Sequence, residues 1–274
     1  NLAPGGGLTL TGALAVDGGT VKLDGNYPTG TDNVALGNTA LDSVEAGGIK
    51  NTVIGSESGT AITTGDANTS VGYRSLLSTT TGTLNASFGD NSLRCNTTGA
   101  NNTGLGTSAL FNNTTASFNT AVGSEALSTN TTGASNVAVG RLSLKCNTTG
   151  CCNTAIGADA LGTNSTGNYN TAVGQNALFA NTTGIVNAAL GGSALLDNTT
   201  GGYNIAVGIS ALENNTTASD NTAIGYRSLY TNTTGCQNVA VGTCSLNANT
   251  DAFKNVAVGF EAGKDNTTAD NLTA

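Results

Sequence analysis

The chain has 274 residues, of which only 9% are charged and 4% aromatic, and it contains 39 glycines, two prolines and no histidine. Its net charge of −8 argues against binding to a nucleic acid or to an anionic membrane surface, because both would need a basic stripe. No run of 18 or more apolar residues is present, so the sequence predicts no insertion into a membrane.

Residues 1–32 do not follow the pattern of the rest of the chain. The stretches "LTLTGALAV" and "TVKLD" alternate apolar with small or polar residues around "DGG", which predicts a β-hairpin or strand pair. Such an N-terminal lead-in would act as a cap and keep an open strand edge from pairing with other chains. Because the chain starts without Met, a basic segment or an apolar signal core, we expect a processed form or a fragment.

Residues 33–270 are an array of 14 repeats of one unit, in which the first step is 18 residues and every later step is 17. Asn occupies the first position from Asn33 to Asn255, and Gly occupies the fifth position in all 14 units. The fourth position is always apolar and the ninth is Leu in 12 of the 14 units. A fixed period of this kind is typical of a solenoid. Residues 271–274 resemble the start of a further, truncated unit.

Each unit is short enough to be one coil. The stretch "NTAVG" predicts a strand whose second and fourth side chains share one face while the third points the other way. The following "xxAL" or "xxSL" predicts a second strand or a turn that returns Leu to the interior, and "NTTG" predicts a turn in which Asn and Gly supply positive φ. We therefore predict an all-β fold, a parallel β-solenoid or β-roll of 17-residue coils stacked about 4.8 Å apart over roughly 65 Å.

Stacked coils would place the first-position asparagines above one another as an amide ladder. This structural role is favoured over a role in binding, and no phosphate-binding "GK[ST]" follows any of the fifth-position glycines. The predicted ladder consists of Asn68, Asn85, Asn102, Asn119, Asn136, Asn153, Asn170, Asn187, Asn204, Asn221, Asn238 and Asn255.

The small third-position residues predict close contact between neighbouring rods, because one coil has few apolar side chains and cannot hide a second face on its own. The alternative is a monomeric solenoid that packs this small column inside. The candidate chain interface consists of Ala121, Ala138, Ala155, Ala172, Ala189, Ala206, Ala223, Ala240 and Ala257.

The six cysteines predict at most local disulfides. Cys146 and Cys151 flank one "NTTG" turn, and Cys236 and Cys244 lie in adjacent coils, so these four are candidate disulfide partners. The remaining two, Cys95 and Cys152, would be free thiols or links between chains. Since the chain has no histidine and no "CxxC" pair, we expect no metal site and no cofactor.

The sequence predicts a protein that is not an enzyme. Without histidine neither a Ser-His-Asp nor a Cys-His arrangement can form. The few acids are scattered, and solvated surface charge is favoured over a paired carboxylate site across two coils; they include Asp90, Glu125, Asp159, Glu213 and Glu261.

The "N-x-A-V-G" and "N-x-A-I-G" units resemble the head repeats of trimeric autotransporter adhesins, which are left-handed parallel β-rolls wound three to a fibre. The family's usual unit is shorter, and the extra residues here fall at the "NTTG" turn. Residues 8–41 are also similar to the entry into the repeat region of phage tail fibre proteins, which carry "NTAVG…AL…NTTG" arrays.

These resemblances imply a homotrimer at an extracellular site or on a virion surface. It would serve as a fibre shaft or adhesin that contributes to host or surface attachment, with a cell-surface glycan or receptor as partner. A bacterial adhesin head is the alternative within this class.

Two further hypotheses concern the exposed columns. Stacked threonines of "NTT" could form an ice-binding array, although adjacent threonines point in opposite directions. Aromatic residues in the variable columns could stack on sugars or pack against the next coil. Ten "NTT" or "NST" sequons could carry glycans, but their role in turns explains them equally. The aromatics are Tyr73, Phe111, Phe179, Tyr226 and Tyr230.

Overall fold

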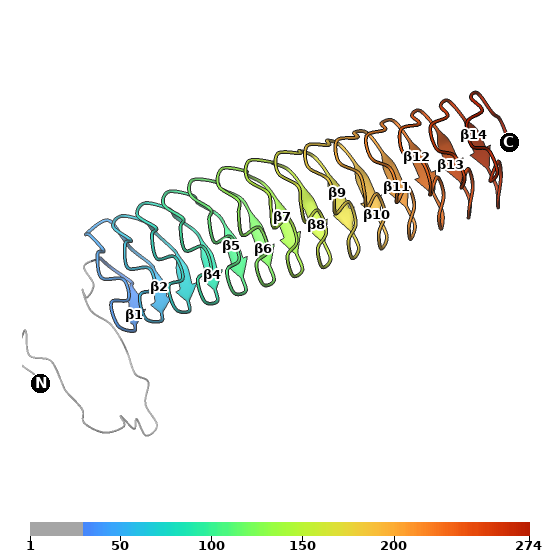
Figure 1. Cartoon of the computed structure of the whole chain (residues 1–274). Coiled ribbons are helices and arrows are strands. Elements are labelled where there is room, and N and C mark those ends of the chain that lie inside the picture. Colours follow the sequence, from blue (N-terminus) through green and yellow to red (C-terminus); the bar gives the residue numbers. More distant parts are fainter. Residues whose placement is uncertain (1–29) are drawn as a thin grey trace, which may run out of the picture.

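The computed structural model describes residues 30–274, which form a rod of stacked coils (Figure 1). Each coil contributes one strand of three residues, and turns and bends join the strands. Residues 30–274 contain no helix, and hence none that could cross a membrane. The strands are β1 (Val34–Leu36), β2 (Thr52–Ile54), β3 (Thr69–Val71), β4 (Ala86–Phe88), β5 (Thr103–Leu105), β6 (Thr120–Val122), β7 (Val137–Val139), β8 (Thr154–Ile156), β9 (Thr171–Val173), β10 (Ala188–Leu190), β11 (Ile205–Val207), β12 (Thr222–Ile224), β13 (Val239–Val241) and β14 (Val256–Val258).

All 14 strands belong to one parallel sheet in chain order, from β1 to β14. Neighbouring strands pair in the register of the repeat, so that Ala172 of β9 lies beside Ala189 of β10. The longer first step is absorbed between β1 and β2, where Val34 pairs with Thr52. The predicted all-β parallel solenoid with 17-residue coils is thus confirmed. The strand pair predicted within residues 1–32 lies outside the described residues.

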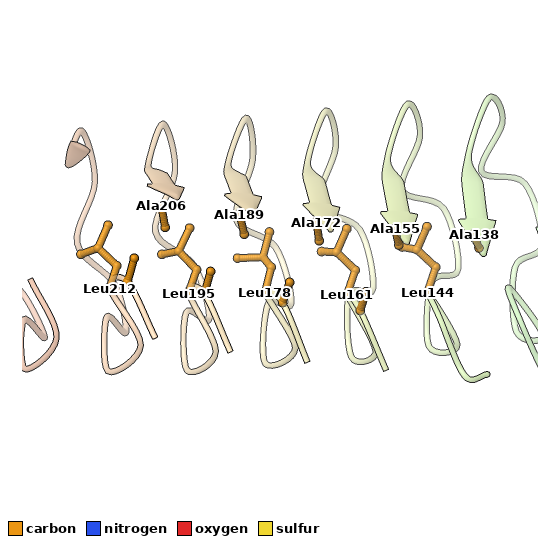
Figure 2. Close-up of a cluster of buried hydrophobic side chains, with 14 of the residues drawn as sticks. Ala138, Leu144, Ala155, Leu161, Ala172, Leu178, Ala189, Leu195, Ala206 and Leu212 are labelled. Atoms are coloured by element: carbon orange, nitrogen blue, oxygen red, sulfur yellow. The ribbon is translucent and has the colours of Figure 1, made fainter. Parts of the chain in front are cut away.

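The hydrophobic core of the rod is built mainly of alanine and leucine side chains. Alanines from the strands point toward leucines from the following turn, as Figure 2 shows for Ala172 and Leu178. Both residues are 0% exposed, and the leucine returns to the interior as predicted. The third side chain is small because the enclosed space is shared with a leucine in the same coil.

The alanine column is therefore not a chain interface. All nine predicted interface residues are 0% exposed within a single chain, so no second chain can reach them. The alternative, a small column packed inside the solenoid, is the correct one. The buried set is Ala121, Ala138, Ala155, Ala172, Ala189, Ala206, Ala223, Ala240 and Ala257.

The turns are shaped by residues with a left-handed backbone conformation, that is, with positive φ, at positions where the sequence does not predict one. In the coil that starts at Asn170, φ is positive at Asn176 (56°), Leu178 (53°) and Val186 (57°). The "NTTG" asparagine and glycine do not have positive φ, so the predicted source of the bend is wrong. Burial of a whole leucine side chain offsets a left-handed backbone that costs about 1–2 kcal/mol.

The fifth-position glycine is required both by its backbone and by its neighbour. Gly174 has a φ of 135°, and a Cβ atom on it would lie 2.6 Å from the carbonyl oxygen of Gly191 in the next coil. No other residue tolerates this combination. This explains why the position is Gly in all 14 coils.

The last residues continue the stacking beyond β14. Thr273 forms an isolated parallel bridge with Val256, and the Leu272 amide donates to the Asn255 side-chain oxygen at 2.8 Å. These contacts occupy the places that the first and second residues of another coil would take. Leu272 and Thr273 therefore stack on Asn255 and Val256 in the 17-residue register of the coils.

The orientation of the strands can be tested by enlarging one residue on each face. Ala172→Leu should lower the free energy of unfolding by about 1–3 kcal/mol because the enclosed channel has no room for the added atoms. Thr171→Leu, on the outward face of the same strand, should change it by no more than about 0.5 kcal/mol. Urea denaturation followed by circular dichroism measures both, and a larger loss in Thr171→Leu would contradict this orientation.

Candidate functional site

The outward side of the sheet is a long uncharged surface, in which the fourth-position column is apolar and half of the second-position column is threonine. We call it the strand face; it consists of the second and fourth residues of every coil, from Val34 and Leu36 in β1 to Val256 and Val258 in β14. In every strand after β1 the middle residue is buried while these two flanking residues are half-buried or exposed. Since the strands stack in register along the rod (Figure 1), their side chains form two continuous columns.

The strand face carries no charge and exposes large side chains. None of its residues is Asp, Glu, Lys or Arg, although both signs occur elsewhere on the coils. Exposure reaches 47% at Leu190 and 61% at Val258. Contiguous apolar surface of this extent marks interaction sites in soluble proteins. The exposed large residues of its fourth-position column are Leu36, Ile54, Phe88, Leu105, Ile156, Leu190, Ile224 and Val258.

The predicted asparagine ladder forms inside the rod. The side-chain nitrogen of Asn170 donates to the Asn153 side-chain oxygen at 3.3 Å and to the Gly184 carbonyl at 2.8 Å. Its own side-chain oxygen accepts from the backbone and side-chain nitrogens of Asn187, at 3.0 and 3.1 Å. The same pattern, with small variations, links the first-position asparagines from Asn51 to Asn255. The ladder is structural, as predicted.

A second ladder, which was not predicted from the sequence, runs through the twelfth position. Asn181 donates to the Asn164 side-chain oxygen at 2.8 Å and to the Gly184 carbonyl at 3.0 Å. That carbonyl also accepts from Asn170, so it joins the two ladders. The signal lies in the recurrence of Asn at this position from Asn96 onward, which by itself predicts only a turn.

The second ladder removes most of the sequons as glycan acceptors in the folded rod. Nine of the ten sequon asparagines are 0% exposed, and only Asn266 in the last coil is partly exposed. A glycan on a buried ladder nitrogen would break the column. The nine buried residues are Asn96, Asn113, Asn130, Asn147, Asn164, Asn181, Asn198, Asn215 and Asn232.

The threonines of "NTT" differ in their surroundings. The Thr182 hydroxyl donates to the Thr199 carbonyl of the next coil at 3.1 Å, and this contact recurs along the column. The next residue, Thr183, is exposed. Before the last coil, only the second threonine of each pair therefore presents a free hydroxyl to solvent.

Neither candidate disulfide forms, because all six cysteines are free thiols. The turn between Cys146 and Cys151 is closed instead by the Asn147 side chain, which donates to the Gly150 carbonyl at 2.9 Å. Burial raises the pKa of the Cys151 thiol, and contact with Cys152 raises it further, so this thiol is a poorer nucleophile than a free cysteine.

The pair Cys236 and Cys244 lies in different columns. Cys236 accepts from the Lys254 amide of the next coil, whereas the Cys244 amide donates to the Tyr226 carbonyl of the coil before. Coils in register bring equivalent positions together, and these two cysteines are not equivalent. The structure therefore does not bring them into one site.

Several acidic side chains form ion pairs on the surface. The Lys145 ammonium lies 2.9 Å from a Glu125 carboxylate oxygen, and this hydrogen bond raises the pKa of Lys145. Asp197 has its pKa raised, first by partial burial and then by the charge of Glu213. Exposed pairs contribute little to stability because water and salt screen them. Besides Lys145–Glu125, the ion pairs are Arg74–Glu57, Arg141–Asp159 and Lys264–Glu261.

The three tyrosines among the predicted aromatic residues are paired with arginines. The Arg74 guanidinium lies 4.7 Å from the centre of the Tyr73 ring. Arg227 lies between two rings, 5.4 Å from Tyr226 and 4.9 Å from Tyr230. These contacts cover one face of each ring, so the aromatic columns are partly occupied by the chain itself.

Comparison with known proteins adds no family to these observations. Neither a scan against models of protein families nor a search of curated proteins finds a match to this chain. The strand face and the variable columns around it are therefore the features from which a function has to be inferred.

Loss of one ladder residue should destabilise the rod from within. Asn170→Ala removes the acceptor of two Asn187 nitrogens and one donor to Gly184, and unpaired buried groups cost about 1–3 kcal/mol each. Gln175→Ala, at an exposed position of the same coil, is the control and should have little effect. Equal midpoints of urea denaturation for the two variants would contradict the role of the ladder.

Free thiols should be detectable without reduction. After unfolding in urea with iodoacetamide, the intact mass should show six alkylated cysteines per chain, with or without prior reduction. A smaller number without reduction would mean that at least one disulfide exists.

Proposed function

We propose that this chain is a non-enzymatic structural rod: a fibre shaft or adhesin, outside the cell or on a virion, whose copies associate as a homotrimer through the strand face. The observation that carries the proposal is an uncharged surface along all 14 strands, whose fourth-position column is apolar in every strand. The interface lies on the opposite side of the strand from the alanines. The resemblance to trimeric adhesin heads and phage tail fibres supports three copies and a role in host or surface attachment.

The size of the strand face supports association between copies. Fourteen strands at about 4.8 Å span roughly 65 Å, and a face about 10 Å wide gives about 650 Å² per chain. A pair of such faces would bury about 1,300 Å², which lies within the range of stable interfaces. Closed symmetry would let three strand faces meet along one axis and would cover this face in every copy.

The proposal also accounts for the uneven distribution of charge. Charged residues occur in the columns of the turns, where they would face water in a fibre. Acids outnumber bases by 17 to nine over the whole chain, which favours solubility of a long, otherwise uncharged rod. A receptor or glycan would contact these variable columns.

Light scattering of the native chain tests the proposal. We expect a mass near three times 26.8 kDa under both reducing and non-reducing conditions. The triple variant Ile156→Lys, Val173→Lys, Leu190→Lys should be monomeric, since it places three like charges in the strand face.

The control is Thr166→Lys, Thr183→Lys, Thr200→Lys, which stacks three lysines at exposed positions of the same coils. It should remain a trimer. A native mass near twice 26.8 kDa would overturn the trimer but keep the interface. A native monomer would overturn both and would favour ice binding by the exposed face, which a thermal hysteresis measurement would then decide.

A further inference from the structure

The tenth position of the coil forms a column in which one small residue leaves a gap. Four successive coils place Arg94, Phe111, Ser128 and Lys145 there. The Arg94 guanidinium lies 5.3 Å from the centre of the Phe111 ring, so the ring has a partner in the coil before it. In the coil after it stands Ser128, which is 7% exposed and too short to fill the space before Lys145.

The gap is a hollow of about 310 Å³ on the rod surface. Phe111 supplies an aromatic wall, and Ser108, Asn112, Glu125, Ser128 and Lys145 supply polar groups. Glu125 and Lys145 hold each other at 2.9 Å across two coils, which leaves further donor and acceptor capacity on both. Within residues 30–274 the side chains of Ser108, Asn112 and Ser128 make no hydrogen bond, so they are available to a ligand.

We propose that this hollow binds one or two pyranose rings of a neutral carbohydrate. The electron-rich face of Phe111 suits the C–H groups on the apolar side of a sugar ring. The hydroxyls and the amide, with the Glu125–Lys145 pair, match the alternating donors and acceptors of sugar hydroxyls. The charges of the pair cancel, which favours a neutral ligand over an anionic one. The volume lies at the small end of ligand sites.

A small residue in this column does not by itself create a hollow. Gly162 stands at the equivalent position one coil after Lys145, yet there the Phe179 ring fills the space: a Cβ atom on Gly162 would lie 2.8 Å from Phe179 Cε2. The difference is that Phe111 lies against Arg94, in the coil on the other side from Ser128. The hollow therefore depends on the combination of Arg94, Phe111 and Ser128 in three successive coils, and it occurs at a defined place on the rod.

The site rests on the proposed attachment role, which it makes more specific, but it does not depend on the association of copies. Its residues occupy the seventh, tenth and eleventh positions of the coil, and none belongs to the strand face. A single chain therefore contains the whole site, whether or not copies associate. Failure of the trimer leaves this inference intact, and failure of sugar binding leaves the trimer intact.

Saturation-transfer NMR of the full chain tests the inference. The probes are the methyl glycosides of glucose, galactose, mannose and N-acetylglucosamine, with sodium glucuronate as the charged comparison. We expect transfer to at least one neutral glycoside. Ser128→Leu, which fills the hollow, and Phe111→Ala, which removes its wall, should each raise the dissociation constant at least about tenfold, or 1.4 kcal/mol.

The same column provides the controls for correct folding of the Ser128→Leu variant. Leucine already occupies the tenth position at Leu77 and Leu196, so Ser128→Leu introduces a residue that the coil accepts. Asn247→Leu makes the same kind of change far from the hollow and should bind as the native chain does. The inference is overturned if no neutral glycoside receives transfer, if Ser128→Leu binds as tightly as the native chain, or if glucuronate binds more tightly than every neutral probe.

Discussion

In-register stacking of the coils is the constraint on which the rest of this structure depends. Each side chain lies between its own equivalents in the coils before and after, so a buried polar column has to satisfy itself. Asparagine can do this because its amide carries both donor and acceptor. An aspartate in the same column would have no donor to offer, and a column of buried carboxylates would repel itself. The two asparagine ladders follow from this requirement.

The narrow interior fixes a second set of residues. Ala172 and Leu178 fill the enclosed channel together, and the coil closes only because Leu178 accepts a left-handed backbone. The two coils without leucine at this position have Gly59 and Gly263, both with positive φ, so the exceptions keep the backbone and give up the side chain. The inward columns are therefore restricted by geometry, and variation is left to the columns that face outward.

Much of this fold could be predicted from the sequence, because a solenoid repeats its constraints in every coil. The period, the strand at "NTAVG", the first asparagine ladder and the inward leucine all follow from columns of identical residues. Alternation along a strand, however, states only that Thr171 and Ala172 face opposite sides, and it does not state which side is enclosed. Positive φ at Leu178 could not be foreseen either, since leucine seldom adopts it.

The two candidate surfaces differ in a way that bears on what each can do. The strand face repeats in every coil, so a weak contact made once is made 14 times, which suits association between long rods. The hollow beside Phe111 exists because the small Ser128 follows a large ring in a column whose residue type changes from coil to coil, so its shape depends on that local combination. In a repeat protein, uniform columns favour assembly and variable columns favour recognition. Local combinations of residues in the variable outward columns are therefore where a specific ligand has to be sought.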